Sequence, residues 1–400
     1  MDDTQRAFIE TFRTFLEEVV QQQRAAPTQL TPLGEVVQEH LGTLISELPV
    51  VSEQIALHRY VDADVALEVL GAEGRLLGVT GGQQRFHEQL PELLSHQFVR
   101  FGPGPVDYGT AAVGVDEQRQ IVVFGMRLFT FDGEPVVTVQ RTAAPQFGRE
   151  TATVEVLSAD PARSGRLLTA LRRLMVERSV LRGKVLSFES GEFGPHASGA
   201  VFLARPSIAA EEVILPPGIL ESVTGHVTGI SDHRQRLLDA GRHLKRGVLL
   251  YGPPGTGKTL TVRHLIGTSE GVTTVLLTGS TLRFIREATE LARAMQPAMV
   301  VLEDVDLVAM ERTMHGGPQP LLFMVLDALD GLDGDADVVF LLTTNRVDTL
   351  EPALAERPGR VDLAVEIPLP DEEARRRLFA LYARELPLSA DAVAAAATRA

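Results

Sequence analysis

The sequence of 400 residues contains neither cysteine nor tryptophan, and its aromatic residues make up only 5% of the chain. The absence of cysteine excludes disulfide bonds and metal sites built on thiolates. No uncharged apolar run approaches the roughly 18 residues that a membrane-spanning helix needs. The first residues, MDDTQRAF, are acidic, unlike the basic start of a signal peptide. We therefore expect a cytoplasmic protein without a membrane span.

Basic residues are in the minority, with 38 Lys and Arg against 53 Asp and Glu and a net charge of −15. This balance disfavours nucleic acid as the main partner. Lysine is especially scarce, with only Lys184, Lys245 and Lys258, and Asn345 is the single asparagine. A composition skewed in this way suggests that a position which keeps Lys or Asn needs its chemistry. Lys258 and Asn345 are therefore candidate functional residues.

The N-terminal part of the chain has the periodicity of helices. Apolar residues recur at helical spacing over residues 8–20, after Thr31-Pro32 and over residues 62–70. The Thr-Pro pair also predicts an N-cap followed by proline in the first turn. We expect residues 1–85 to form a helical segment. Its apolar faces either pack on the rest of the chain or bind a partner.

Residues 86–212 change to an α+β pattern with strand-like runs rich in Val, Ile and Phe. Asp132-Gly133 predicts a hairpin turn, and Asp160-Pro161 predicts the start of a helix. We identify no catalytic constellation in this region, so we expect an α+β domain of unknown function. The stretch from Pro206 to Gly218 predicts a linker to the region that follows.

Residues 248–259, VLLYGPPGTGKT, combine an apolar strand, a glycine-rich turn and the start of a helix. This is the G-x-x-x-x-G-K-[ST] pattern of a phosphate-binding loop in its required setting. Backbone N–H groups and the positive end of the helix would hold the phosphates. Lys258 would reach the β- and γ-phosphates, and the Thr259 hydroxyl would bind Mg²⁺. The predicted nucleotide-binding residues of the loop are Gly252, Pro253, Pro254, Gly255, Thr256, Gly257, Lys258, Thr259 and Leu260. The alternative is a Gly/Pro turn with an incidental lysine.

The run Ala298 to Asp306, AMVVLEDVD, is an apolar strand that ends in acids. Such a strand places carboxylates beside Mg²⁺ and the γ-phosphate. Glu303 would hold the metal, and Asp304 would orient or deprotonate the attacking water. The usual order is Asp and then Glu, so the two side-chain lengths are exchanged here. Slow hydrolysis, or binding without hydrolysis, is therefore a second expectation.

A third predicted buried strand, residues 338–342, runs into Thr343-Thr344-Asn345. The amide of Asn345 can donate to a γ-phosphate and accept from the attacking water. We predict that Asn345 senses the γ-phosphate. A turn-capping asparagine is the alternative.

With GPPGTGKT, LLTTNR and ERPGRVD in this order, the chain from about residue 213 onward resembles the AAA ATPase family in its protein-remodelling sense. The resemblance implies a P-loop NTPase fold of the α/β class, with a doubly wound parallel sheet over residues 213–370 and the start of a helical lid over residues 371–400. It implies Mg-ATP as ligand and a homo-oligomeric ring, commonly a hexamer. It also implies that Arg357 and Arg360 reach the ATP of a neighbouring subunit. Gly229 matches the family's segment near the adenine.

One departure from the family concerns the segment after residue 278. Family members carry an aromatic pore loop there, but here Thr278-Gly279-Ser280 runs directly into a helical pattern. We expect Phe284 to be a core residue. This puts the threading of unfolded protein through a ring in doubt.

Two functional hypotheses of different classes follow. In the first, an ATP-hydrolysing ring remodels a protein partner that the N-terminal region recruits. In the second, the chain is a nucleotide-gated oligomeric scaffold with little or no hydrolysis. A clamp-loader or replication-initiator role is disfavoured by the net acidity and by the lack of a recognisable DNA-binding element.

Overall fold

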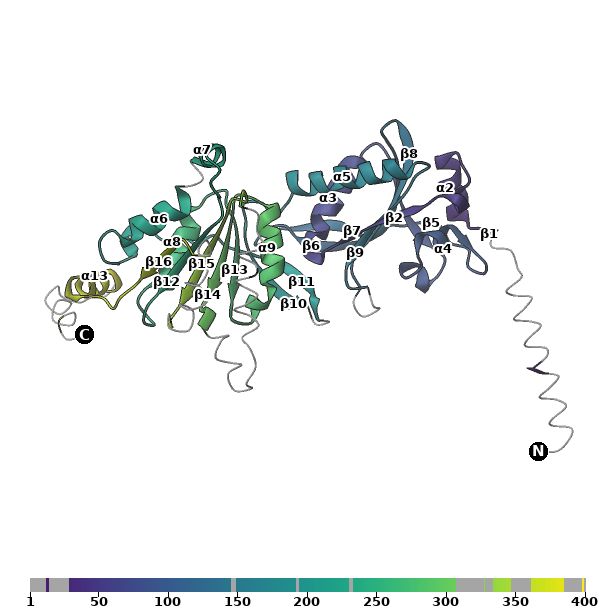
Figure 1. The fold of residues 1–400 in the computed structure, drawn as a ribbon. Helices are drawn as coiled ribbons and strands as arrows, with labels where there is room; N and C mark the ends of the chain where they lie inside the picture. The colour runs from purple at the N-terminus through teal and green to yellow at the C-terminus, as the bar shows by residue number, and fades with distance from the viewer. Residues whose placement is uncertain are drawn as a thin grey trace, which may run out of the picture. The chain divides into compact units, whose positions relative to one another are not determined.

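The computed structural model describes residues 12–13, 29–144, 149–191, 194–229, 233–306, 327, 334–346, 361–384 and 398. The chain forms two compact units, and we treat each by itself (Figure 1). The first comprises Met1–Ala111 and Gln120–Arg178, and the second comprises Ala112–Arg119 and Ser179–Ala400. Most of the helix predicted over residues 8–20 lies outside the described residues.

The first unit is built on an antiparallel sheet with the strand order β2-β9-β8-β7-β3-β5, and β6 also pairs with β7. The predicted turn at Asp132-Gly133 connects β7 to β8, and both residues have the positive φ of such a turn (52° and 79°). The strands are β2 (Val50–Ile55), β3 (Arg75–Thr80), β5 (Gly102–Gly104), β6 (Asp107–Ala112), β7 (Gln118–Phe131), β8 (Glu134–Arg141) and β9 (Ala152–Leu157). A separate short pair consists of β1 (Gln29–Leu30) and β4 (Ser95–His96).

Helices cover both faces of this sheet. Val137 and Val139 of β8 pack into the same core as α2 (Pro32–Leu41) and α4 (Leu90–Leu94). The alternate residue Gln140 faces the other way and donates a hydrogen bond to Asp64 of α3 (Tyr60–Leu70). α5 (Pro161–Glu177) packs beside α3 (Figure 1). Single helical turns occur at η1 (Ile45–Glu47), η2 (Leu57–Arg59) and η3 (Gln83–Phe86).

Both predicted helix starts in this unit are confirmed. The side chain of Thr31 accepts a hydrogen bond from the backbone N–H of Gly34, and that of Asp160 accepts from the N–H of Ala162. Each helix has proline in its first turn. In contrast, residue 85 is not a domain boundary, because β2 pairs with β9 and β3 pairs with β5 and β7, all strands that follow it in the chain. The described part of residues 1–85 is therefore mixed α/β rather than a helical segment.

His58 of η2 is a buried imidazole whose pKa is lowered to about 4, chiefly by burial and further by the charge of Arg59. A histidine whose pKa is lowered by folding contributes stability that is fully present above the pKa of the unfolded state. This stability is lost as the pH falls through the pKa of the folded state. We expect the free energy of unfolding to decrease by roughly 3 kcal/mol between pH 6.5 and pH 4 on account of His58. Denaturation of His58→Gln should show a flatter acid limb than wild type, whereas replacement of the exposed His87 by Gln should leave the limb unchanged. An identical limb in His58→Gln would contradict the assignment.

The second unit contains a sheet with the strand order β11-β10-β13-β14-β15-β12-β16. All neighbouring strands are parallel except the edge strand β11, which is antiparallel to β10. The strands are β10 (Val185–Gly191), β11 (Gly194–Leu203), β12 (Arg246–Tyr251), β13 (Thr273–Thr278), β14 (Ala298–Glu303), β15 (Val338–Thr344) and β16 (Leu363–Glu366). The predicted P-loop NTPase fold with a parallel sheet is confirmed.

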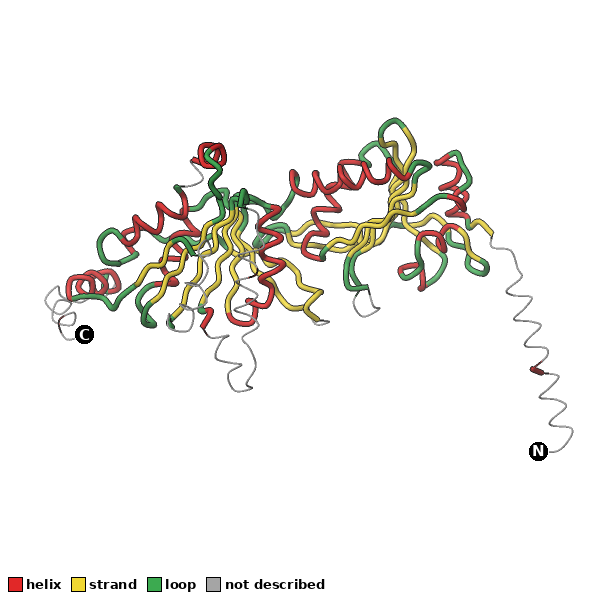
Figure 2. The backbone as a smooth tube through the Cα atoms, in the orientation of Figure 1, coloured by secondary structure: helices red, strands yellow, loops and turns green. Residues whose placement is uncertain are grey.

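Successive residues of the buried strands point into two separate cores. Val248 and Leu250 of β12 pack with α6 (Ile219–Thr228) and α8 (Lys258–Thr268). Leu249 faces the opposite core, which contains α9 (Ile285–Ala294). Figure 2 shows the helices in red on both sides of the yellow strands. This is the doubly wound arrangement, which buries strands on both faces. Further elements are η5 (Ala210–Glu212), α7 (Arg234–Asp239), η7 (Gly279–Phe284) and α13 (Glu372–Tyr382), the last where the lid was predicted to begin.

The stretch Pro206 to Gly218 does not separate two domains. β10 and β11, which precede it, belong to the sheet of the second unit. Arg205 donates hydrogen bonds to four backbone carbonyls of this unit, those of Gly183, Ile266, Ser269 and Val272. Val213 and Leu215 are buried in the core with α6 and α8. The main segment of the second unit therefore starts near residue 179, before the predicted boundary at residues 212–213.

None of the helices in the described ranges is long and apolar enough to cross a membrane.

Candidate functional site

The glycine-rich loop connects β12 to α8 at the carboxyl edge of the parallel sheet. The φ values of Gly252, Gly255 and Gly257 are 145°, 76° and 104°, which residues with a Cβ rarely adopt. Gly257 is the N-cap of α8, so the free N–H groups of the first helical turn face the loop. The loop is thus arranged as a site for an anion.

Lys258 is the first residue of α8, and its side chain folds back over the loop. Its Nζ donates to the carbonyl oxygens of Gly252 (2.8 Å) and Pro253 (2.7 Å). Partial burial lowers the pKa of the ammonium, and the charges of Asp304 and Asp306 oppose this effect. An ammonium has three donors, so one remains after these two bonds.

A polar cavity of about 440 Å³ opens beside the loop. Three separated segments meet around it: the loop with the start of α8, the residue after β14 and the residue after β15. The lining residues are Pro254, Gly255, Gly257, Lys258, Thr259, Leu260, Arg263, Asp304 and Asn345. Most of the predicted site residues thus lie around one cavity, which has the donors and acceptors expected of a phosphate site.

Glu303, the last residue of β14, lies against Thr259, which lines this cavity. Burial raises the pKa of its carboxyl and the charge of Asp304 adds to the rise, while the hydrogen bond from Thr259 and the charge of Arg263 act against it. Its Oε1 is buried and has no hydrogen-bond partner among the described residues. A buried carboxylate oxygen without a partner, beside a threonine hydroxyl, matches the oxygen donors that Mg²⁺ prefers. The residues present therefore fit a magnesium ion held by Thr259 and Glu303.

Asp304 and Asn345 lie next to each other in the lining of the cavity. Asn345 Nδ2 lies 3.4 Å from Asp304 Oδ1, and the Asn345 backbone N–H donates to Asp306 Oδ1 at 3.1 Å. Asp306 also accepts a hydrogen bond from the Thr344 hydroxyl (3.1 Å) and is only 4% exposed. The buried Asp306 thus fixes the backbone that carries Asn345, a contribution that its place in the sequence did not indicate.

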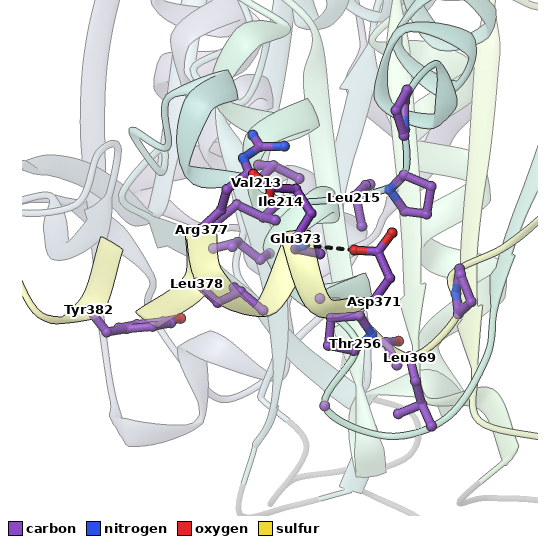
Figure 3. Close-up of a pocket in the computed structure, with 18 residues that line it drawn as sticks. Val213, Ile214, Leu215, Thr256, Leu369, Asp371, Glu373, Arg377, Leu378 and Tyr382 are labelled. Carbon is purple, nitrogen blue, oxygen red and sulfur yellow. Dashed lines mark hydrogen bonds between the residues drawn. The ribbon is translucent and has the colours of Figure 1, made fainter. Parts of the chain in front are cut away.

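A second cavity, of about 470 Å³, lies on the other side of the loop (Figure 3). In Figure 3, Arg377 and Leu378 of α13 lie near Val213 and Ile214, and Asp371 caps the helix by accepting from the N–H of Ala374. The lining is largely apolar. It consists of Val213, Ile214, Leu215, Pro216, Pro217, Gly255, Thr256, Gly257, Leu260, Pro368, Leu369, Pro370, Asp371, Glu373, Ala374, Arg377, Leu378 and Tyr382.

The two cavities share Gly255, Gly257 and Leu260 as lining residues. A ligand with an apolar, planar part and an anionic part could therefore bind across the loop, with one part in each cavity. Pro253 contributes its carbonyl, which accepts from both Lys258 and the Thr256 hydroxyl. Gly252 is the first residue of the loop, and its Cα faces the backbone of Ile367.

Of the predicted site residues that the structure describes, Gly229, Gly252, Pro253 and Glu303 are not among those that line either cavity. Gly229 is the C-cap of α6, where its N–H donates to the carbonyl of Gly225, and it is not among the described residues that line either cavity. Arg357 and Arg360 lie outside the described residues.

The sequence reading missed Arg263, which lies one helical turn after Thr259 and lines the polar cavity. It also missed the apolar run Val213–Leu215 as part of a cavity. The available signal was that this run is followed by two prolines and that the Ile367–Asp371 segment is likewise apolar and contains two prolines. Phe284 is only 1% exposed and packs against Phe188 (ring centroids 5.7 Å apart), which confirms it as a core residue.

The sequence was also compared with known protein families and with known proteins. Residues 248–369 match the ATPase family associated with various cellular activities (AAA). Relatives include a 26S proteasome regulatory subunit 4 homolog of Oryza sativa subsp. japonica, which is 36% identical over 173 residues, 40% of this chain and 38% of that protein. The proteasome-activating nucleotidase of Methanocaldococcus jannaschii is 33% identical over 205 residues, 47% of this chain and 46% of that protein. The chain thus spans less than half the length of these relatives. The resemblance predicted from the motifs is confirmed: residues 248–369 form an AAA domain.

Proposed function

We propose that this AAA domain binds Mg-ATP and hydrolyses it to ADP and phosphate. The observation that carries the proposal is the polar cavity, at which Lys258 and Thr259, Asp304, and Asn345 meet from three segments of the chain. A lysine, a hydroxyl, a carboxylate and an amide are the groups that phosphoryl transfer to water requires. The family of the domain agrees with this chemistry.

Each group has a separate part in the proposed reaction. The free donor of Lys258 binds the β- and γ-phosphates, and the Asn345 amide binds the γ-phosphate and the attacking water. Asp304 orients that water or accepts its proton. Thr259 and Glu303 hold the magnesium ion, which when bound neutralises charge on the phosphates. The exposed Arg263 adds positive charge to the lining of the cavity.

The purine base occupies the apolar cavity in this proposal. A base there would contact Val213–Leu215 on one side and the Pro368–Pro370 segment on the other. The ribose would pass over Gly255 and Gly257, whose lack of side chains allows the close approach. Because α13 contributes part of the wall, nucleotide binding would also act on the start of the lid.

Assembly and partner form the second part of the proposal. Arg357 and Arg360 of the ERPGR segment would reach the ATP of a neighbouring copy in a ring, commonly a hexamer, and stabilise charge on the transferred phosphoryl group. The relatives are named as proteasome regulatory subunits and as a proteasome-activating nucleotidase. In line with these names, we propose that the N-terminal region recruits a protein client and that hydrolysis remodels it.

A nucleotide-gated scaffold with little hydrolysis is the second candidate function. Two observations favour it. The acids stand in Glu-Asp order, so the carboxylate nearest Asn345 is the shorter one. The segment after β13 folds at once into η7 and α9, with Phe284 in the core rather than free to grip a polypeptide.

Steady-state ATPase assays and sizing in ADP and in ATP distinguish the two functions. The proposed hydrolase turns over ATP, loses turnover in Asp304→Asn and in Arg360→Ala, and assembles more readily in ATP than in ADP. Wild-type turnover no higher than that of Asp304→Asn, with ATP-dependent assembly intact, would replace the hydrolase by the scaffold. Turnover retained by Arg360→Ala would refute the role of this arginine in a neighbouring site.

A further inference from the structure

Asp304 has an unusual backbone conformation for a residue directly after a buried strand. Its φ is 50°, in the left-handed region that disfavours residues with a Cβ. In the described ranges, Asp132 (52°) is the only other non-glycine residue with positive φ, and it lies in the β7–β8 hairpin turn, where the geometry requires it. Asp304 lies in no hairpin, so another feature must stabilise its conformation.

A side chain of the neighbouring strand supplies this stabilisation. The backbone ladder between β14 and β15 ends at the pair Leu302 and Leu342. The next free N–H, that of Asp304, donates to Oγ1 of Thr343 at 3.0 Å. Thr343 is fully buried. Because this bond goes to a side chain, the chain can turn away from the strand direction and still satisfy its buried N–H group.

The turn carries the Asp304 carboxylate to the polar cavity. Asp304 lines this cavity together with Lys258, and its Oδ1 lies within 3.4 Å of Asn345 Nδ2. An aspartate reaches one methylene less far than a glutamate, so its Cα must approach the cavity more closely. The left-handed turn provides that approach.

We infer that Thr343 is a positioning residue for the proposed hydrolysis: its hydroxyl holds Asp304 in the left-handed conformation that brings a short carboxylate to the attacking water. The inference rests on the proposed function. It explains why this chain can have aspartate in the second acid position. The adjacent threonines contact different acids. The Thr344 hydroxyl donates to the Asp306 carboxylate, and the Thr343 hydroxyl accepts from the Asp304 backbone N–H.

Two substitutions separate the hydroxyl from the shape of Thr343. Thr343→Val removes the acceptor and keeps the volume, and Thr343→Ser keeps the acceptor. Thr274→Val is the matched control, because Thr274 is a fully buried threonine of β13 whose Oγ1 has no hydrogen-bond partner among the described residues. Thr343→Ala replaces Thr343→Val should the valine variant not fold.

The kinetic measurement compares the effect of each substitution on kcat with its effect on ATP binding. We expect Thr343→Val to lower kcat at least about tenfold while KM and the Kd of ATP change by less than about twofold. Thr343→Ser should keep kcat within about threefold of wild type, and Thr274→Val should match wild type. A crystal structure of Thr343→Val should show that residue 304 no longer has a positive φ.

The outcomes separate this inference from the proposed function. Wild-type turnover with an equal kcat in Thr343→Val overturns the positioning role and leaves the hydrolase intact. A loss of kcat that Thr343→Ser does not recover, or that Thr274→Val shares, also overturns it. If the wild type has no turnover, the proposed hydrolysis fails and the positioning of a hydrolytic water fails with it. A positive φ at residue 304 that persists in Thr343→Val overturns the structural step whatever the kinetics.

Discussion

Replacement of Lys258 by methionine weakens ATP binding by on the order of 100-fold or more. The variant keeps the length of the side chain but removes the ammonium, which lies over the loop on the carbonyls of Gly252 and Pro253. One or two charge-assisted hydrogen bonds to phosphate oxygens are lost with it, which corresponds to about 3 kcal/mol. Titration of a fluorescent ATP analogue measures this loss directly.

The exposed Lys184 offers a matched control, since Lys184→Met removes the same charge far from the loop in sequence. Its affinity for ATP should equal that of the wild type. Wild-type affinity in Lys258→Met would refute the assignment of residues 252–259 as the phosphate-binding loop, whichever of the two candidate functions holds.

Gly252→Ala should destabilise the folded protein by about 3 kcal/mol or more and abolish nucleotide binding. The φ of Gly252 is 145°, and a Cβ added there would lie 2.2 Å from the carbonyl oxygen of Ile367. Ile367 is fully buried, and its N–H is bonded to the carbonyl of Tyr251. Neither backbone can move aside without breaking the junction of β12 and β16. Thermal unfolding and the same titration report both effects.

Gly271→Ala separates the steric clash from the strain of a positive φ. Gly271 has a φ of 73°, and an added Cβ would have no atom within 4 Å. This variant should lose only about 1 kcal/mol of stability and should bind ATP like the wild type. Equal destabilisation by the two alanines would show that the contact with Ile367 is not responsible.

The features that were predictable from the sequence depend on local patterns. The loop needs glycines at fixed spacing before a lysine, and the strands of the second unit are continuous apolar runs that end in polar residues. In a parallel sheet the carboxyl ends of the strands meet at one edge. The meeting of Lys258, Asp304 and Asn345 at one cavity therefore followed from three local readings and one rule of topology.

The features that were missed depend on contacts between distant segments. β10 and β11 lie in the region where strand-like runs were expected, but nothing local indicates that β10 pairs with β13. The apolar cavity forms only when Val213–Leu215 and Pro368–Pro370 come together from positions about 150 residues apart. The backbone N–H of Asp304, which has a left-handed conformation, is bonded to a hydroxyl of another strand. The local sequence, an aspartate after an apolar run, does not indicate this contact.

The membership of β10 and β11 in the parallel sheet determines where the AAA domain can be cut from the chain. A fragment that begins at residue 213 would lack both strands and Arg205, and would leave the largely buried strand β13 as an open edge. An exposed edge of this kind is a template for intermolecular strand pairing and aggregation. A fragment that begins near residue 179 keeps the natural antiparallel edge. The folded unit that contains the AAA domain is therefore larger than its sequence motifs indicate, and we expect its solubility in isolation to depend on residues that precede every one of them.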